Sequence, residues 1–299
     1  MKIRLFDGAP LLSRLCMGTS TFAREIDQMA AFQLLDHAYE RQITLIDTAA
    51  TYSSGASEMV VGAWLSSRRP DPARLMVATK IYPPYTPAAI DAAVKASTER
   101  LGVAIIDVLY LHKWDKDAES PDTLQALDGL ITAGRVRCLG VSNFTTEQLS
   151  TVLELQSHLG LRTFAILQNN NNLALRDVDG ALVALCQKFG VALVTYSPLG
   201  AGFLTGKHRG GVTPGSRFDV APGHQAIYFQ PTATRRLDLL EAVATRAGVP
   251  LPHLALAWAI HRPGVASVLI GGRVPAHLDQ AFAALAFNDP KLFAAVEAE

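Results

Sequence analysis

The stretch LIDTAATYSSGASE, residues 45–58, decides the fold prediction. Its first residues continue a short apolar run that ends at Ile46 and predicts a buried parallel strand. Asp47 follows directly, and Tyr52 lies further on, in a polar turn. From Met59 onward, apolar residues recur at helical spacing. The stretch therefore predicts a strand, a loop that carries a carboxylate and a phenol, and a helix. By themselves, Asp47 is more simply explained as a turn cap and Tyr52 as a packing residue.

The alternation of strand and helix continues along the chain. Eight apolar stretches have the pattern of parallel strands: RLCMG, ITLID, LMVATK, IIDVLYLH, VRCLGVSNF, FAILQN, VALVTYSPL and VASVLIGG. Helical patterns occupy residues 28–41, 59–65, 87–101, 121–133, 147–155, 179–189, 237–247, 254–261 and 275–285. Such units in about 250 residues are typical of the (β/α)8, or TIM, barrel of the α/β class. A doubly wound open sheet is the rival architecture, but its GxGxxG dinucleotide motif is missing after the first strand.

Two segments lie outside this regular series. At the N-terminus, KIRLF and LLSRL lie on either side of Asp7-Gly8, which predicts a β-hairpin. After the seventh strand, residues 207–235 are rich in Gly, Pro and polar residues and predict a long irregular loop. No change in composition marks a linker, so we expect a single barrel domain over residues 1–299.

The overall composition argues against some classes of function. The 27 basic and 27 acidic side chains balance, which gives no electrostatic reason to expect nucleic acid or an anionic membrane as a partner. Cys16, Cys138 and Cys186 have neither disulfide nor metal-site spacing and indicate a reducing compartment. The first residues lack the apolar core of a signal peptide, and no apolar run approaches the roughly 18 residues of a membrane span. We therefore expect a cytoplasmic protein without a metal site.

Polar side chains follow nearly every predicted strand. In a (β/α)8 barrel the carboxyl ends of the strands meet at one face, where the active site forms. The residues at these positions are Asp47, Tyr52, Lys80, His112, Ser142, Asn143, Gln168, Asn169, Tyr196 and Ser197. Each alone has an ordinary structural explanation, such as a solvated strand end or a histidine at the rim. Together they predict a site, because a core does not need a polar group at nearly every strand end.

Four of these groups make chemical sense as a set. A free tyrosine has a pKa near 10, which is too high for ready proton transfer near neutral pH. A lysine ammonium such as that of Lys80, if close to Tyr52, would stabilise the phenolate and lower this pKa. The carboxylate of Asp47 would keep the lysine charged and oriented, and His112 would hold a carbonyl oxygen beside the phenol. The set predicts a general acid for a carbonyl group that accepts a hydride.

Several motifs, in a fixed order, carry a family resemblance: IDTAATYSSGASE, ATKI, YLHKWD, AGRVRCLGVSNF, LQNNNNL and TYSPLGAGFLTGK. Their order and spacing resemble those of the aldo-keto reductases over residues 15–285. The resemblance is to the long-loop bacterial kind, which includes aryl-alcohol-dehydrogenase-like members and is similar to potassium-channel β-subunits. It implies a catalytic tetrad of Asp47, Tyr52, Lys80 and His112.

The resemblance also implies where a nicotinamide cofactor is held, with the irregular loop 207–235 covering it. The implied contacts are Ser142, Asn143 and Gln168 for the carboxamide, Tyr196 for ring stacking, Ser197, Leu199, Gly202 and Lys207 for the pyrophosphate, Gly18 and Thr19 for the nicotinamide ribose, and Gly271, Arg273, His277 and Gln280 for the adenosine end. The Arg273 guanidinium suits the 2′-phosphate of NADPH. Ala281 stands where the family usually has asparagine, so NAD remains an alternative to the expected NADP.

The substrate is less well specified. Phe22, Tyr82, Tyr85 and Trp114 follow strand ends and predict an apolar pocket, with packing on the barrel rim as an equal alternative. The predicted function is reduction of aldehydes or ketones by NAD(P)H, with Tyr52 as the acid. One alternative is an NAD(P)-dependent dehydrogenase of an aldose or other alcohol, since the same tetrad serves both directions. The other is a non-enzymatic, nicotinamide-binding regulatory subunit. The sequence predicts no oligomeric state.

Overall fold

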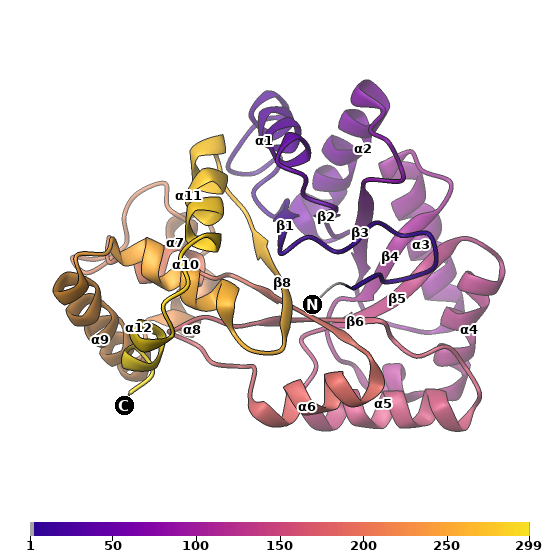
Figure 1. Ribbon diagram of the computed structural model, residues 1–299. Coiled ribbons are helices and arrows are strands. Elements are labelled where there is room, and N and C mark those ends of the chain that lie inside the picture. Colours follow the sequence, from indigo (N-terminus) through magenta and orange to yellow (C-terminus); the bar gives the residue numbers. More distant parts are fainter. Residues whose placement is uncertain (1–2, 299) are drawn as a thin grey trace.

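In the computed structural model, which describes residues 3–298, eight parallel strands close into a barrel, and each pairs with its neighbours in sequence (Figure 1). The strands are β1 (Leu15–Gly18), β2 (Leu45–Asp47), β3 (Met76–Ile81), β4 (Ile106–Leu111), β5 (Val136–Ser142), β6 (Ile166–Asn170), β7 (Ala192–Tyr196) and β8 (Val265–Ile270). The last strand returns to the first, where Val268 pairs with Leu15. This closure confirms the predicted TIM barrel and leaves no open sheet edge.

The helices that follow the strands surround the barrel in Figure 1. They are α1 (Gln28–Glu40), α2 (Ala56–Arg68), α3 (Pro87–Leu101), α4 (Pro121–Thr132), α5 (Thr146–His158), α6 (Gly180–Phe189), α9 (Pro231–Ala247), α10 (Leu251–His261), α11 (Pro275–Leu285) and α12 (Pro290–Ala295). As predicted, Thr86 caps α3 and Gly190 ends α6 in the left-handed region. Within residues 3–298, no helix is long and apolar enough to cross a membrane.

Alternation along the strands separates the barrel interior from the layer under the helices. Ala78 of β3 packs in the interior with Tyr110, whereas Val77 packs with the surrounding helices. Lys80 lies two residues after Ala78, so its side chain also points inward, at the carboxyl end of the strand. Gly140 of β5 leaves space for the Tyr110 ring in the barrel interior, because a Cβ atom at this position would lie 2.7 Å from Tyr110 Cδ1.

The predicted N-terminal hairpin is wrong in the part that the structure describes, and its first residue, Lys2, lies outside that part. Residues 3–13 contain no strand, and a single backbone hydrogen bond joins their ends, from Leu12 N to Ile3 O (2.8 Å). Pro10 has no N–H to donate to a ladder. Leu5 and Leu12 are buried with residues of the barrel interior. The segment therefore packs against the barrel instead of forming a two-stranded ladder.

The segment after β7 is more ordered than predicted. It contains η3 (Gly200–Thr205), α7 (Arg217–Val220), η4 (Pro222–His224) and α8 (Gln225–Tyr228). Residues 231–235, which were predicted to be irregular, belong to α9. Phe203, Phe218 and Tyr228 hold the segment together, because all three are buried in one hydrophobic cluster with α9 and α10. We call residues 200–230 the strap.

Candidate active site

A cavity of about 710 Å³ lies at the carboxyl ends of the strands, and each of the eight strands contributes to its wall through its last residues or the segment that follows. Its volume is within the usual range for a small-molecule or cofactor site. The predicted site residues that line it are Gly18, Tyr52, Tyr82, His112, Ser142, Asn143, Gln168, Tyr196, Ser197, Leu199, Gly202, Lys207, Gly271, Arg273, His277 and Gln280. The structure thus brings together residues that are distant in sequence, as the barrel prediction required.

Lys80 lies fully buried beneath this wall, and its ammonium makes three hydrogen bonds. Nζ donates to Asp47 Oδ1, to Thr48 O (3.0 Å) and to Tyr52 Oη (3.2 Å). An ammonium has three donors, so each N–H has a partner. The carboxylate and the phenol predicted to act with Lys80 are therefore both in direct contact with it.

The electrostatics of this group depart from the prediction in one respect. Burial opposes the charge of Lys80, but Asp47 and Tyr52 outweigh it and raise the pKa of the ammonium. Burial also raises the pKa of the Tyr52 phenol, while the charge of Lys80 acts to lower it. The lysine acts on the phenol in the predicted direction, but the net pKa shift is upward because burial has the larger effect. The prediction that the phenol pKa falls below its ordinary value is thus wrong.

His112 lies beside Tyr52 with its ring edge-on, at a centroid distance of 5.9 Å. Its Nδ1 is 3.2 Å from Thr51 Oγ1. Burial, together with the charge of Lys80, lowers the pKa of the imidazole to about 3. His112 is therefore neutral near pH 7, and a neutral imidazole offers one N–H donor and one acceptor.

Side chains from neighbouring strand ends are joined by hydrogen bonds. Gln168 Nε2 donates to Asp47 Oδ2 (2.8 Å), so the residue predicted to hold a carboxamide also orients the buried carboxylate. Tyr196 Oη donates to Asn143 Oδ1 (2.6 Å), and Asn143 Nδ2 donates to His112 O (2.9 Å). These bonds fix the relative positions of the segments that follow β4, β5 and β7.

The loop that carries Tyr52 has an unusual backbone. Ser53, Ser54 and Gly55 all have positive φ angles, of 49°, 54° and 91°. Left-handed conformations cost free energy for residues other than glycine, so the surrounding contacts must hold them. One such contact is the hydrogen bond from Ser53 Oγ to Phe22 O (2.8 Å). The loop after β1 and the loop after β2 are therefore tied together beside Tyr52.

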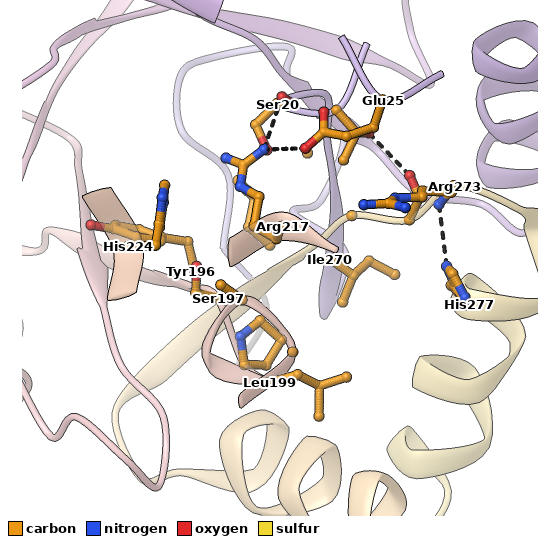
Figure 2. A pocket seen from close by; sticks show the side chains of 18 of the residues that line it. Ser20, Glu25, Tyr196, Ser197, Leu199, Arg217, His224, Ile270, Arg273 and His277 are labelled. Carbon is orange, nitrogen blue, oxygen red and sulfur yellow. Dashed lines mark hydrogen bonds and ion pairs between the residues drawn. The ribbon is translucent and has the colours of Figure 1, made fainter. Parts of the chain in front are cut away.

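The strap is joined to the loop after β1. Figure 2 shows Arg217, on the strap, pointing toward Ser20 and Glu25. Arg217 Nη1 lies 2.8 Å from Glu25 Oε1, and Arg24 Nε lies 2.8 Å from Glu25 Oε2. These three charged side chains line the cavity but were not predicted as site residues. Because the Arg217–Glu25 pair joins residues 192 positions apart, no local pattern reveals it. The only sequence signal was the charged pair Arg24-Glu25, shortly after a strand end.

Two further cations lie around His277. Burial and the charges of Arg273 and Lys207 lower the pKa of His277. Arg273 Nη1 donates to Gly215 O of the strap (2.8 Å), and its backbone N–H donates to His277 Nδ1 (3.2 Å). Within residues 3–298, Lys207 Nζ makes no hydrogen bond or ion pair. This end of the cavity therefore has positive charge available for an anion.

Several predicted site residues besides the buried Asp47 and Lys80 do not line the cavity. The Thr19 hydroxyl is buried and donates to the backbone carbonyl of Asp47 (3.0 Å), so it supports the end of β2 instead of the cavity wall. Phe22 is fully buried in the main hydrophobic cluster. Trp114 packs against the same cluster, and its Nε1 donates to Glu119 (2.8 Å). Apolar burial thus draws both aromatic rings away from the predicted pocket, whereas Tyr82 lies on the cavity wall and is 49% exposed.

Comparisons with known proteins agree with this geometry. A family model described as the aldo/keto reductase family matches residues 14–296. Norsolorinic acid reductase B of Aspergillus parasiticus is 29% identical over 306 residues, covering 90% of this chain and 79% of that protein. The aldo-keto reductase dtxS3 of Metarhizium robertsii is 28% identical, covering 92% and 82%. The aryl-alcohol dehydrogenase GME11368 of Pestalotiopsis microspora is 28% identical, covering 93% and 76%.

Proposed function

Because the chain belongs to the aldo/keto reductase family, we propose that it reduces an aldehyde or ketone with NADPH and uses Tyr52 as the general acid. Family membership makes the protein an oxidoreductase that acts on carbonyl or alcohol groups. The observation that carries the finer proposal is the bonding of Lys80, whose ammonium contacts both Asp47 and the Tyr52 hydroxyl below the cavity.

The cavity fits a nicotinamide dinucleotide. Lys207 and Arg273 provide cations for phosphate groups, and within residues 3–298 the Lys207 ammonium makes no hydrogen bond or ion pair. The Tyr196 ring, fixed through Asn143, lines the wall nearer to Tyr52 and offers a flat surface for an aromatic ring. When bound, the cofactor would supply a hydride to the carbonyl carbon.

The protein residues complete the reaction by moving a proton. The Tyr52 hydroxyl gives its proton to the carbonyl oxygen, which produces the alcohol and leaves a phenolate. The Lys80 ammonium, 3.2 Å from this oxygen, stabilises the phenolate. Neutral His112 orients the carbonyl oxygen through its remaining ring nitrogen, without competing as an acid.

A screen of carbonyl compounds tests this function. The purified protein is mixed with aldehydes and ketones and with NADPH or NADH, and the absorbance of the reduced nicotinamide is followed. We expect carbonyl-dependent loss of absorbance, faster with NADPH. If a panel of aromatic and aliphatic carbonyls gives no turnover although the cofactor binds, the proposed reduction is wrong.

Oxidation of an alcohol is a second candidate function. One relative is named an aryl-alcohol dehydrogenase, and in the reverse direction the Tyr52 phenolate, held by Lys80, would accept the proton of the alcohol. The screen therefore includes alcohols with NADP⁺ and NAD⁺. The ratio of the carbonyl reduction rate to the alcohol oxidation rate, measured at neutral pH with matched concentrations, shows which direction the enzyme favours.

A further inference from the structure

The loop after β1 places an arginine at the Tyr52 end of the cavity. Residues 22–26 form a tight turn in which Ala23 N donates to Ile26 O (3.0 Å) and Ala23 has a φ of 56°. Arg24 follows Ala23 in this turn. The Phe22 carbonyl, at the start of the turn, accepts the hydrogen bond from Ser53 Oγ in the neighbouring Tyr52 loop. The turn that carries Arg24 is thus bonded directly to the loop that carries the proposed acid.

Arg24 faces the cavity and retains donor capacity. It lines the wall together with Thr51, Tyr52 and Tyr82, and its side chain is 34% exposed. Nε donates to Glu25 and Nη2 donates to Ser20 O (2.6 Å), whereas Nη1 makes no hydrogen bond within residues 3–298. Burial raises the pKa of the Tyr52 phenol, and the charges of Lys80 and Arg24 both act against this rise. The charge of Arg24 therefore acts on the Tyr52 phenol, which is the proposed proton donor.

The neighbouring carboxylate does not neutralise this charge. Glu25 is shared between Arg24 and Arg217, each at 2.8 Å, and its side chain is only 2% exposed. A single carboxylate between two guanidiniums leaves one positive charge without compensation. A guanidinium that borders a cavity and has a free N–H is a natural partner for an anion.

Cations other than Arg24 are available in the cavity to bind the cofactor phosphates. Burial and the charges of Lys207 and Arg273 lower the pKa of His277, whereas the charge of Arg24 acts to lower the pKa of Tyr52. Lys207 and Arg273 thus lie close enough to act on His277, and Arg24 lies close enough to act on the Tyr52 phenol. In the proposed binding mode, the phosphates lie near Lys207 and Arg273, and the reacting carbonyl lies near Tyr52 and Arg24.

We propose that Arg24 binds an anionic group of the substrate, so that the enzyme prefers aldehydes or ketones that bear a carboxylate over uncharged ones. This inference rests on the proposed function and specifies the substrate class of the same site. One guanidinium with one uncompensated charge matches a carboxylate monoanion better than a phosphate dianion. The sequence alone gave no sign of an anionic substrate, because Arg24 is an isolated arginine in its loop.

Matched substrate pairs test the inference. The ratio of kcat/KM for 3- or 4-formylbenzoate to kcat/KM for the corresponding methyl ester is measured with wild type and Arg24→Gln. We expect wild type to favour at least one acid over its ester and Arg24→Gln to lower that ratio by about 10- to 100-fold, the equivalent of one charge-assisted hydrogen bond. An effect of Arg24 on the acidity of Tyr52 would change kcat/KM for the acid and for the ester by the same factor, so it cancels in the ratio. Arg246→Gln, at an exposed position on α9, should leave the ratio unchanged.

Two outcomes would overturn the inference. In one, wild type shows no preference for either acid; in the other, Arg24→Gln slows acid and ester equally, as expected for a cofactor contact or a structural role. Calorimetric binding of 4-(hydroxymethyl)benzoate and its methyl ester to the NADP⁺-loaded protein gives the same comparison without turnover. If no carbonyl is reduced but the acid binds more tightly in an Arg24-dependent way, the proposed reaction fails while the inference stands.

Discussion

At the scale of single residues, the proposed chemistry depends on Lys80. Its three hydrogen bonds reach a carboxylate, a backbone carbonyl and the phenol, and Lys80, Asp47 and Thr48 are fully buried. In such surroundings a charge acts strongly on its neighbours, because little water screens it. Burial alone would make Tyr52 a very weak acid, and the lysine counteracts this effect. The acidity of Tyr52 is thus a balance between burial and the surrounding charges, of which that of Lys80 has the largest effect.

Replacing Lys80 by methionine should disturb that balance in a known direction. Without the ammonium, burial acts unopposed by its largest counteracting charge and raises the pKa of Tyr52 further. The phenolate needed for alcohol oxidation then forms only at higher pH. We expect the rising limb of the oxidation rate against pH to move to higher pH and the maximal rate to fall. A variant with the wild-type profile and rate would remove Lys80 from the proposed mechanism.

The same variant needs a stability control. Lys80→Met leaves Asp47 buried without its partner, and breaking a buried ion pair typically costs about 3–5 kcal/mol. Urea unfolding, followed by circular dichroism, shows whether the variant is still folded at the assay temperature. The double variant Lys80→Met, Asp47→Asn removes the unpaired charge and should recover part of the lost stability without recovering the rate.

At the scale of secondary structure elements, close helix packing depends on single glycines. Gly62 of α2 faces the end of α3, where an added Cβ atom would lie 2.6 Å from Arg100 O and 2.7 Å from Leu101 O. Backbone oxygens cannot turn aside as a side chain can, so a methyl group forces the two helices apart. This contact supports the loop just before α2, which carries Tyr52.

Gly62→Ala should therefore destabilise the protein by about 1–3 kcal/mol, as overpacking usually does. Gly129 of α4 provides the matched control, because an added Cβ atom there meets no atom within 4 Å. Gly129→Ala should stabilise the protein by up to about 1 kcal/mol through helix propensity. The free energy of unfolding of both variants is measured in urea. Equal effects of the two substitutions would show that α2 does not pack on α3 as described.

The elements that could be predicted from sequence are those with local patterns. Helices such as α3 have apolar periodicity and a cap at Thr86, and the barrel strands have short apolar runs. The failures depend on long-range packing. Leu5 and Leu12 belong to the two predicted hairpin strands, but both are buried with residues of the barrel interior instead of pairing in a ladder. Residues 231–235 lack an apolar run before Leu237, so the start of α9 was not evident.

The candidate site shows the same division. The proximity of the four proposed tetrad residues could be expected because each lies at or shortly after the carboxyl end of a strand, where a barrel gathers functional groups. Phe22 and Trp114 were assigned wrongly, because a sequence does not show whether a loop aromatic points to the cavity or to the core. Arg217 was missed because its partner Glu25 is brought near only by the folded strap.

At the scale of the whole molecule, the cavity wall combines a reactive part with a cationic part. Tyr52 contributes the first, with Lys80 buried beneath it, and Lys207, Arg273 and His277 contribute the second. The strap connects the two, because Arg217 bonds to the loop after β1 and Gly215 accepts a hydrogen bond from Arg273. This arrangement suits an elongated ligand with an anionic part and a reactive part.

Arg273→Ala tests the assignment of the anionic end. Loss of a charge-assisted hydrogen bond of roughly 1.5–3 kcal/mol should weaken NADPH binding by about ten- to more than a hundredfold. NADH lacks the 2′-phosphate, so its affinity should fall only through the lost contact with Gly215 of the strap. Fluorescence titration of wild type and variant with both reduced cofactors gives the comparison. Equal losses would assign Arg273 to the strap or the pyrophosphate instead of the 2′-phosphate.

Whether Tyr52 donates the proton is tested most directly by Tyr52→Phe, measured for both cofactor binding and the rate of carbonyl reduction. The substitution removes only the hydroxyl that Lys80 contacts and keeps the ring beside His112. We expect NADPH affinity to remain close to that of wild type and the reduction rate to fall by about 10²–10⁴-fold, the usual contribution of a general acid. A Tyr52→Phe protein that binds NADPH and reduces a good carbonyl substrate at the wild-type rate would contradict this assignment.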